Sequence, residues 1–222
     1  MGDSRDRMVQ SAATLMGKRG MNATSFSDVL AESGAPRGSI YHHFPEGKRQ
    51  LTECAMRLTS DQILTYMRSS TATTAEEVVR HFLALFRQVV VASGGEAGCT
   101  IAGVTIDVAD DEDDLLVVAR DAFQSWVSLL AAQLESTGVA PERAHRVAVI
   151  SIASVEGGLI LCRAEGSDEP LRVVEEELLA LLPDPGSLEG GDPACWAGLL
   201  CEECGVVIAE GPHRPTCRAR VN

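Results

Sequence analysis

Residues 25–51 constrain the fold more than any other stretch, because they mark the ends of two short helices at close spacing. Ser25 and Asp28 have the spacing of a capping box, in which each side chain satisfies a free amide at the start of a helix. Gly34 can adopt the left-handed conformation that ends this helix, and Pro36 suits the first turn of the next one. A turn of about three residues between two helices predicts a helix-turn-helix unit.

The second helix of this unit is polar and aromatic where an ordinary core helix would be apolar. Ile40 and Phe44 are expected to point inward. Five side chains are then free to face mostly outward: Arg37, Ser39, Tyr41, His42 and His43. An α-helix fits the major groove of DNA, where such side chains reach phosphates and base edges. Lys48 falls at the start of the following helix, and a helix N-terminus beside a lysine is a suitable phosphate site.

The segment GAPRGSIYHHFPEGKRQL, residues 34–51, resembles the DNA-binding signature of TetR/AcrR-type transcriptional regulators. The resemblance extends upstream through an expected first helix at about residues 4–18 and the beginning of the second at 24–26. The PxGKxxL pattern at 45–51 is similar to the multidrug and flavonoid-responsive repressors of that family. Beyond about residue 60 the likeness rests on helix pattern and on two looser segments, 98–111 and 155–171.

Together, the motif and the resemblance predict the residues that contact DNA. The expected readers of base edges are Arg37, Ser39 and His42. The expected phosphate contacts are Thr24, Tyr41, His43 and Lys48. Ser25, Pro36 and Gly38 complete the predicted set. In the alternative interpretation, the Tyr-His-His-Phe run is a half-buried aromatic cluster of an ordinary helical protein.

The charge of the chain is unevenly distributed, which bears on DNA binding. The whole chain carries a net charge of −13, from 32 Asp or Glu and 19 Lys or Arg. Residues 1–50 contain seven Lys or Arg and five Asp or Glu, a net charge of +2, so the remainder carries −15. Because salt screens charges beyond roughly 8–10 Å, the local positive charge governs attraction to phosphate. DNA binding is therefore expected to be salt-sensitive and to depend on a dimer.

The pattern of apolar residues predicts an all-α protein with three parts. Residues 1–47 form the expected helix-turn-helix domain, and residues 48–183 a larger helical domain for ligand binding and dimerisation. Residues 184–222 form a tail rich in Pro, Gly and Cys. The most apolar stretch, 147–161, is interrupted by Glu156 and is expected to be too short and polar to cross a membrane. With no signal peptide visible, a cytoplasmic protein without membrane contact is expected.

Two distal segments carry apolar and small residues spaced by three and four, as in helices that pack at shallow angles. The first comprises Val147, Ile150, Ser154, Gly157 and Leu161, and the second Leu171, Val174, Leu178 and Leu181. They are either intramolecular core or a dimer interface, and the resemblance favours a homodimer. A two-fold dimer places its reading helices roughly 34 Å apart, facing successive major grooves of a near-palindromic operator.

The resemblance also implies that a small apolar or amphipathic effector binds the distal domain and shifts the dimer to a state that releases DNA. The predicted pocket residues are Met67, Phe86, Ile106, Phe123 and Trp126, each of which is alternatively plain core. No nucleophile and base pair, metal cluster or phosphate loop indicates an enzyme in the folded region. The competing function is an unregulated DNA-binding or protein-interaction module that lacks a small-molecule pocket.

The tail holds four of the seven cysteines. Cys201 and Cys204 have zinc-knuckle spacing, and His213 and Cys217 could complete a tetrahedral site. Nothing similar belongs to the resembled family, and a disordered appendage is the simpler interpretation. No cofactor is expected apart from this optional zinc ion.

Overall fold

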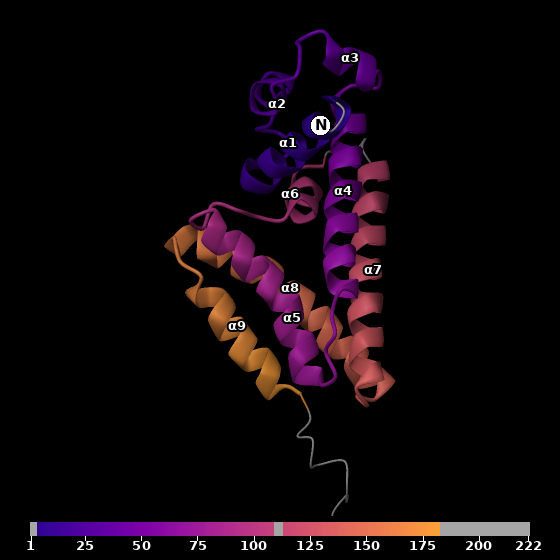
Figure 1. Cartoon of the computed structure of the whole chain (residues 1–222), viewed down its shortest axis with the longest axis vertical. Helices are drawn as coiled ribbons and strands as arrows, with labels where there is room; N and C mark the ends of the chain where they lie inside the picture. The colour runs from indigo at the N-terminus through magenta and orange to yellow at the C-terminus, as the bar shows by residue number, and fades with distance from the viewer. Residues whose placement is uncertain (1–3, 109–112, 183–222) are drawn as a thin grey trace, which may run out of the picture. The chain divides into compact units, whose positions relative to one another are not determined.

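The computed structural model describes residues 4–108 and 113–182, and every regular element in these ranges is an α-helix (Figure 1). The all-α prediction is therefore confirmed. The helices are α1 Ser4–Arg19, α2 Phe26–Ser33, α3 Ser39–His43, α4 Lys48–Arg68, α5 Ala75–Ala92, α6 Thr100–Asp107, α7 Asp113–Ser136, α8 Pro141–Glu165 and α9 Glu169–Ala180. Helix α4 begins directly after residue 47, where the boundary between the two domains is predicted. The four residues of the predicted zinc site lie outside the described ranges.

Helices α1, α2 and α3 form a small unit at one end of the chain's described part (Figure 1). The capping box of Ser25 and Asp28 is present at the start of α2, and Gly34 ends this helix with φ 63°. Helix α3 begins only at Ser39, because residues 36–39 form a turn. In this turn the Ser39 amide donates to the Pro36 carbonyl at 3.0 Å. Ile40 and Phe44 are fully buried, as predicted, and anchor α3 against α1.

The distal helices form a bundle in which α4 and α7 run side by side and α8 packs along α7 (Figure 1). Helix α5 contacts α7, α8 and α9. The bundle core contains fully or almost fully buried side chains, among them Phe82, Leu83, Leu115 and Trp126. Because α4 also packs against α1, one continuous helix joins the helix-turn-helix unit to the distal bundle.

Two described segments, Asp114–Ser136 of α7 and Pro141–Glu165 of α8, are long and apolar enough to cross a membrane by length and composition. Helix α8 is thus longer than the apolar stretch 147–161 considered in the sequence. The core helices of a helical bundle have the same composition, and these two helices pack chiefly against each other. Their place in the fold accounts for their apolar character.

The junction between α1 and α6 is a backbone contact made possible by glycine. A Cβ on Gly17 would lie 2.7 Å from the Gly98 carbonyl oxygen, and one on Gly98 would lie 2.5 Å from the Gly17 carbonyl oxygen. No larger residue fits either position without a shift of the backbone. Thr100 donates its hydroxyl to the Ala13 carbonyl at 2.9 Å, and the Asn22 amide donates to the Asp107 carboxylate at 2.9 Å. These contacts hold the first helix of the helix-turn-helix unit directly against the distal bundle.

Candidate DNA interface and effector cavity

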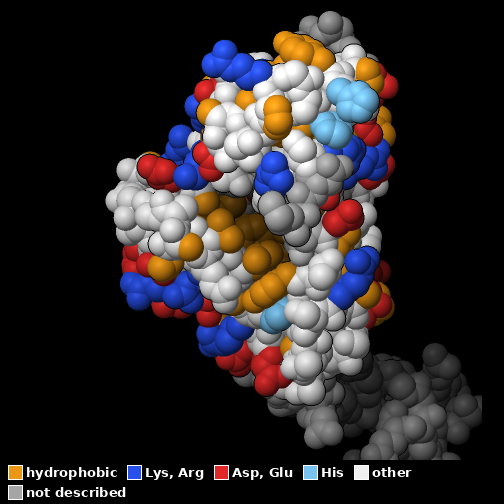
Figure 2. All heavy atoms as spheres, turned by 45° about the horizontal axis from the view of Figure 1, so that its top comes forward, with side chains coloured by type: hydrophobic (Ala, Val, Ile, Leu, Met, Phe, Trp, Pro, Cys, Tyr) orange, Lys and Arg blue, Asp and Glu red, His pale blue; other side chains and the backbone are white. Residues whose placement is uncertain are grey.

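The outward face of α3 and the turn before it carry the polar side chains predicted to contact DNA. Arg37, Tyr41 and His42 are exposed, and 68% of the Tyr41 surface is free. The Tyr41 ring packs edge-on against Phe26 with 5.7 Å between centroids, which fixes its direction without burying it. Figure 2 shows Lys, Arg and His side chains on the surface of this end of the protein. The geometry is that of a presented helix rather than a closed aromatic cluster.

The remaining predicted contacts are less free. Ser39 is half-buried and donates its hydroxyl to the Pro36 carbonyl at 2.7 Å. His43 is half-buried and lies edge-on to His42, with 5.3 Å between ring centroids. Lys48 is half-buried at the start of α4. These three side chains are therefore less accessible than those of Arg37, Tyr41 and His42.

Thr24 occupies a different place from the one expected for a phosphate contact. Its side chain is buried, with 1% exposed, and its hydroxyl donates to the Gly20 carbonyl at 2.8 Å. A buried hydroxyl that has already donated its proton cannot also meet a DNA backbone. In this structure Thr24 fixes the connection between α1 and α2 and does not belong to the exposed surface. Ser25 is exposed, but its hydroxyl serves the capping box.

Ion pairs separate the basic residues of this unit into two groups. Arg19 pairs with Asp28 at 2.9 Å, and Arg49 pairs with Glu46 at 2.5 Å and with Asp114. Hydrogen bonds from Ser25, together with Arg19, lower the pKa of Asp28, so this carboxylate stays charged. Arg37 and Lys48 form no ion pair with any residue that the structure describes. Their charges are therefore available to phosphate or base edges.

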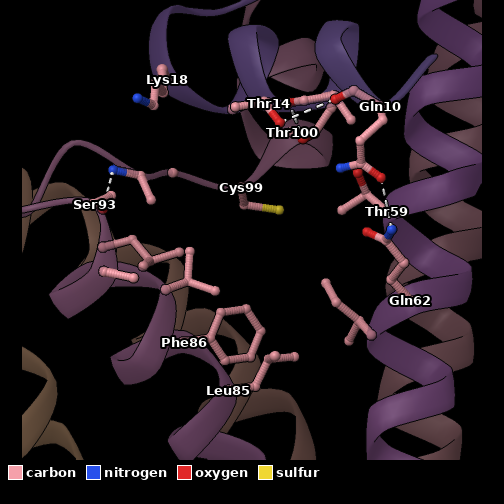
Figure 3. A pocket seen from close by; sticks show the side chains of 18 residues that line it. Gln10, Thr14, Lys18, Thr59, Gln62, Leu85, Phe86, Ser93, Cys99 and Thr100 are labelled. Atoms are coloured by element: carbon pink, nitrogen blue, oxygen red, sulfur yellow. Dashed lines mark hydrogen bonds between the residues drawn. The ribbon is translucent and has the colours of Figure 1, made fainter. Parts of the chain in front are cut away.

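A cavity of about 500 Å³ opens between the helix-turn-helix unit and the distal bundle. Helix α1 supplies Gln10, Thr14 and Gly17 to its wall, and α4 supplies Thr59 and Gln62. Figure 3 shows Phe86 and Leu85 of α5 on the opposite side, with the Cys99 sulfur pointing into the space between them and α1. The hollow visible in Figure 2 is lined by hydrophobic side chains. A mostly apolar cavity with a few polar groups is typical of a small-molecule site.

The polar side of this cavity connects α1 to α4. Gln62 donates its amide to the Gln10 side chain at 3.0 Å across the cavity edge (Figure 3). Both glutamines keep further donors and acceptors, so a ligand can exchange hydrogen bonds with either one. A molecule bound here would touch α1 of the helix-turn-helix unit directly.

Only one of the five residues predicted to line the pocket, Phe86, lines this cavity. Ile106 lines a second, adjoining cavity of about 300 Å³. Met67 and Trp126 are core residues that line neither cavity, and Phe123 packs edge-on against Trp126 with 5.2 Å between centroids. Met67 and Trp126 are buried in the bundle interior and Phe123 is half-buried, so a role of these three residues in effector binding stays a prediction. The sequence reasoning missed Gln10, Thr14, Gln62 and Cys99, which are not distinguished by apolar spacing.

The second cavity has an acidic group in its wall. Glu156 of α8 contributes to it together with Met16, Ile160 and Cys99. The Glu156 Oε1 atom is shielded from solvent and has no hydrogen-bond partner among the residues that the structure describes. Burial raises the pKa of Glu156 to about 7, although a hydrogen bond with Cys99 lowers it in part. Burial, and then the charge of Glu156, also raise the pKa of the Cys99 thiol, which therefore stays protonated at neutral pH.

Replacing Glu156 by glutamine is expected to stabilise the fold at pH 8 more than at pH 4.5. The folded protein holds the Glu156 proton to a pKa of about 7, against an ordinary value of 4.5. The proton on Glu156 stabilises the folded protein fully below its pKa of 4.5 in the unfolded chain. This stabilisation, on the order of 3 kcal/mol, is lost as pH rises through the pKa of about 7 in the folded protein. Unfolding free energies of both proteins across this pH range measure the effect. A difference that stays constant with pH would contradict a buried carboxyl.

Two family models match the chain. "Bacterial regulatory proteins, tetR family" matches residues 9–54, and "Transcriptional regulator LmrA/YxaF-like, C-terminal domain" matches residues 75–177. The uncharacterized HTH-type transcriptional regulator Rv0196 of Mycobacterium tuberculosis is 37% identical over 183 residues, which span 80% of this chain and 93% of the relative. The HTH-type transcriptional regulator LmrA of Bacillus subtilis is 27% identical over 176 residues, 77% of this chain and 92% of LmrA. Among solved structures, a TetR transcriptional regulator from Legionella pneumophila aligns with a TM-score of 0.71 at 23% identity, over 82% of this chain and 99% of that one.

Proposed function

Because this chain belongs to the TetR family of transcriptional regulators, we propose that it is a repressor whose dimer binds a near-palindromic operator and is released by a small apolar or amphipathic effector. Its relatives are transcriptional regulators rather than enzymes. The observation that carries the proposal is the cavity of about 500 Å³, whose wall includes α1 of the helix-turn-helix unit. A ligand in that position acts on the DNA-binding unit without an intermediate element. The same cavity argues against an unregulated DNA-binding or interaction module.

The proposed DNA contacts follow the exposure of the reading helix. Arg37 and His42 are the principal readers of base edges, because both side chains are exposed and can donate to base edges, and Ser39 lies beside them. The proposed phosphate contacts are Tyr41, His43 and Lys48. Ser25, Pro36 and Gly38 are exposed or lie at exposed helix ends and stay within the proposed surface.

The proposed dimer interface is the outer face of α8 with part of α9. Exposed apolar residues lie on α8 and on or directly after α9, namely Val149, Ile150, Leu161, Val173 and Leu181. A Cβ on Gly157 would meet nothing within 4 Å, so this exposed glycine leaves room for a partner helix. Of the two predicted seams, Ile150, Gly157 and Leu161 face outward. Val147, Leu171 and Leu178 are buried in the protomer instead.

The proposed release mechanism uses the junction of α1 with α6. Gly17, Gly98 and Thr100 line the larger cavity. Gly17 and Gly98 also form the close backbone contact at this junction, and Thr100 adds the hydrogen bond from its hydroxyl to the Ala13 carbonyl. An effector that fills the cavity would alter this contact and move α1 relative to the distal bundle. If the effector favours a dimer conformation whose reading helices are too far apart for consecutive grooves, it increases the fraction of dimers that cannot bind the operator. The proposed site of action is the cytoplasm, and no cofactor is required.

We expect the purified dimer to bind a duplex from the region upstream of its own gene, or of a divergent neighbour, at least about a thousandfold more tightly than random duplex. Fluorescence anisotropy with labelled duplexes at fixed ionic strength measures both affinities. Affinity for either duplex should fall with added salt, because phosphate contacts release counterions. Equal affinity for upstream and random DNA would refute the repressor proposal. Compounds can then be screened for effectors that release the labelled duplex from the protein, which lowers its fluorescence anisotropy.

A further inference from the structure

Glu156 is an acidic side chain that forms no ion pair within the described part of the chain, in a cavity wall that is mostly apolar. Its shielded Oε1 atom has no hydrogen bond within the described part of the chain, and no ion pair involves this residue there. A shielded carboxylate oxygen without a hydrogen bond destabilises the ionised side chain, since the hydration of that oxygen is lost and no donor replaces it. The group therefore has unused capacity to bind an opposite charge.

The cavity around Glu156 is suited to an apolar ligand with one polar end. Its wall includes Met16 of α1, Ile106 of α6 and Ile160 of α8. It adjoins the larger cavity, because both share Gly17, Ala97, Gly98, Cys99 and Leu159. A ligand can place its polar end at Glu156 and an apolar group toward the larger cavity near Cys99.

The other titratable groups near Glu156 form no ion pair with it. The Cys99 thiol is neutral because its pKa is raised. Arg163 also lines the cavity, but its guanidinium donates to the Lys18 carbonyl and forms no ion pair with Glu156. Lys18 pairs with Glu96 at 3.3 Å, and the Asp107 carboxylate accepts from the Asn22 amide. Glu156 is thus the acidic group of this cavity among the residues that the structure describes.

We propose that the effector is an apolar organic cation whose amine or quaternary ammonium group lies against the Glu156 carboxylate. This inference rests on the proposed function, of which it specifies the ligand class. A cation supplies the missing partner inside an apolar wall, where opposite charges attract more strongly than in water. An uncharged ligand of the same shape gains only the contact with the apolar wall.

Binding of a permanent cation is linked to the proton on Glu156. In the free protein this carboxyl has a pKa of about 7, and the cation favours its deprotonated form. Affinity should therefore be about tenfold weaker at pH 6 than at pH 8, with a proton released on binding at the lower pH. The uncharged isostere should bind equally at both pH values.

The probes are 4-phenylbutyl-trimethylammonium and its uncharged tert-butyl isostere, titrated calorimetrically into the full-length dimer at pH 6 and 8. For the wild-type protein at pH 8 we expect the cation to bind at least about tenfold more tightly than the isostere. Glu156→Gln should remove this preference and the pH dependence together. Glu165→Gln, an exposed acid at the end of the same helix, should leave both unchanged. Glu156→Gln is expected to fold, because it removes a destabilising buried carboxyl, and thermal unfolding checks this.

Three outcomes overturn the inference: no binding of the cation to the wild-type protein, equal affinity for cation and isostere, or unchanged cation affinity in Glu156→Gln. The same samples are tested for specific binding to upstream DNA, which separates the two proposals. Specific DNA binding without cation binding refutes the ligand class and leaves the repressor proposal standing. Cation binding at Glu156 without specific DNA binding supports the ligand site and refutes the repressor.

Discussion

Arg37→Ala is expected to weaken operator binding by roughly 30-fold or more, the largest effect of any single side chain on α3 or the turn before it. A bidentate contact from arginine to a guanine is worth about 1–3 kcal/mol, and a dimer loses two such contacts. Arg37 is exposed and makes no ion pair among the described residues, so no ion pair has to break before its guanidinium contacts DNA. Anisotropy titrations with upstream and random duplexes at one salt concentration measure the loss.

Two further variants identify what Arg37 contributes. Arg57→Ala removes an equally exposed cation from α4, where it pairs with Glu53 at 2.9 Å, and should change operator affinity little. Arg37→Lys keeps the charge but not the bidentate geometry. If Arg37 reads a base, Arg37→Lys should remain defective and specificity should fall with affinity. Full recovery by lysine would reassign Arg37 to a phosphate, and unchanged affinity in Arg37→Ala would refute its role in DNA binding.

The helix-turn-helix unit could be predicted from the sequence because its signals are local. The capping box of Ser25 and Asp28, and the left-handed Gly34, each depend on residues within one turn of helix. The inward direction of Ile40 and Phe44 follows from helical spacing alone. Thr24 shows the limit of this reasoning, because its hydroxyl is used by the Gly20 carbonyl, a partner that a surface motif does not indicate.

The cavity could not be predicted, because it is a gap among five helices that are distant in the sequence. Apolar spacing identifies buried faces such as those of Met67 and Trp126, but not where the packing of those faces leaves space. Gln10 and Thr14 belong to α1, which the sequence predicts as part of the helix-turn-helix domain, and nothing in their spacing indicates contact with a ligand of the distal domain. The signal that does exist is a pair of glycines, Gly17 and Gly98, which bring α1 against the segment before α6.

Helix α8 could be predicted as a helix but not divided into its two faces, since it is apolar around most of its circumference. A single spacing of three and four residues joined Val147 and Ile150 into one predicted seam. The structure separates them, because Val147 is buried in the protomer and Ile150 is exposed. Periodicity alone cannot divide such a helix into a face for the protomer core and a face for a partner.

Leu161→Glu is expected to convert the dimer into monomers and to abolish measurable operator binding. Leu161 is 52% exposed on the outer face of α8, so a charge there disturbs the isolated protomer little. Across a two-fold interface it would bury two uncompensated carboxylates, each costing several kcal/mol, which raises the dimer dissociation constant by about a thousandfold or more. Sedimentation velocity measures the loss of the dimer, and fluorescence anisotropy of a labelled operator at the same protein concentrations measures the loss of DNA binding.

Val91→Glu is the matched control, because Val91 is also an exposed apolar residue, with 66% of its surface free, but lies on α5 outside the proposed interface. It should stay dimeric and bind the operator as the wild-type protein does. If Val91→Glu dissociates the dimer and Leu161→Glu does not, the interface is formed by α5 rather than α8. If Leu161→Glu becomes monomeric but keeps full operator affinity, dimerisation through α8 is not required for DNA binding, and the two-groove geometry is wrong.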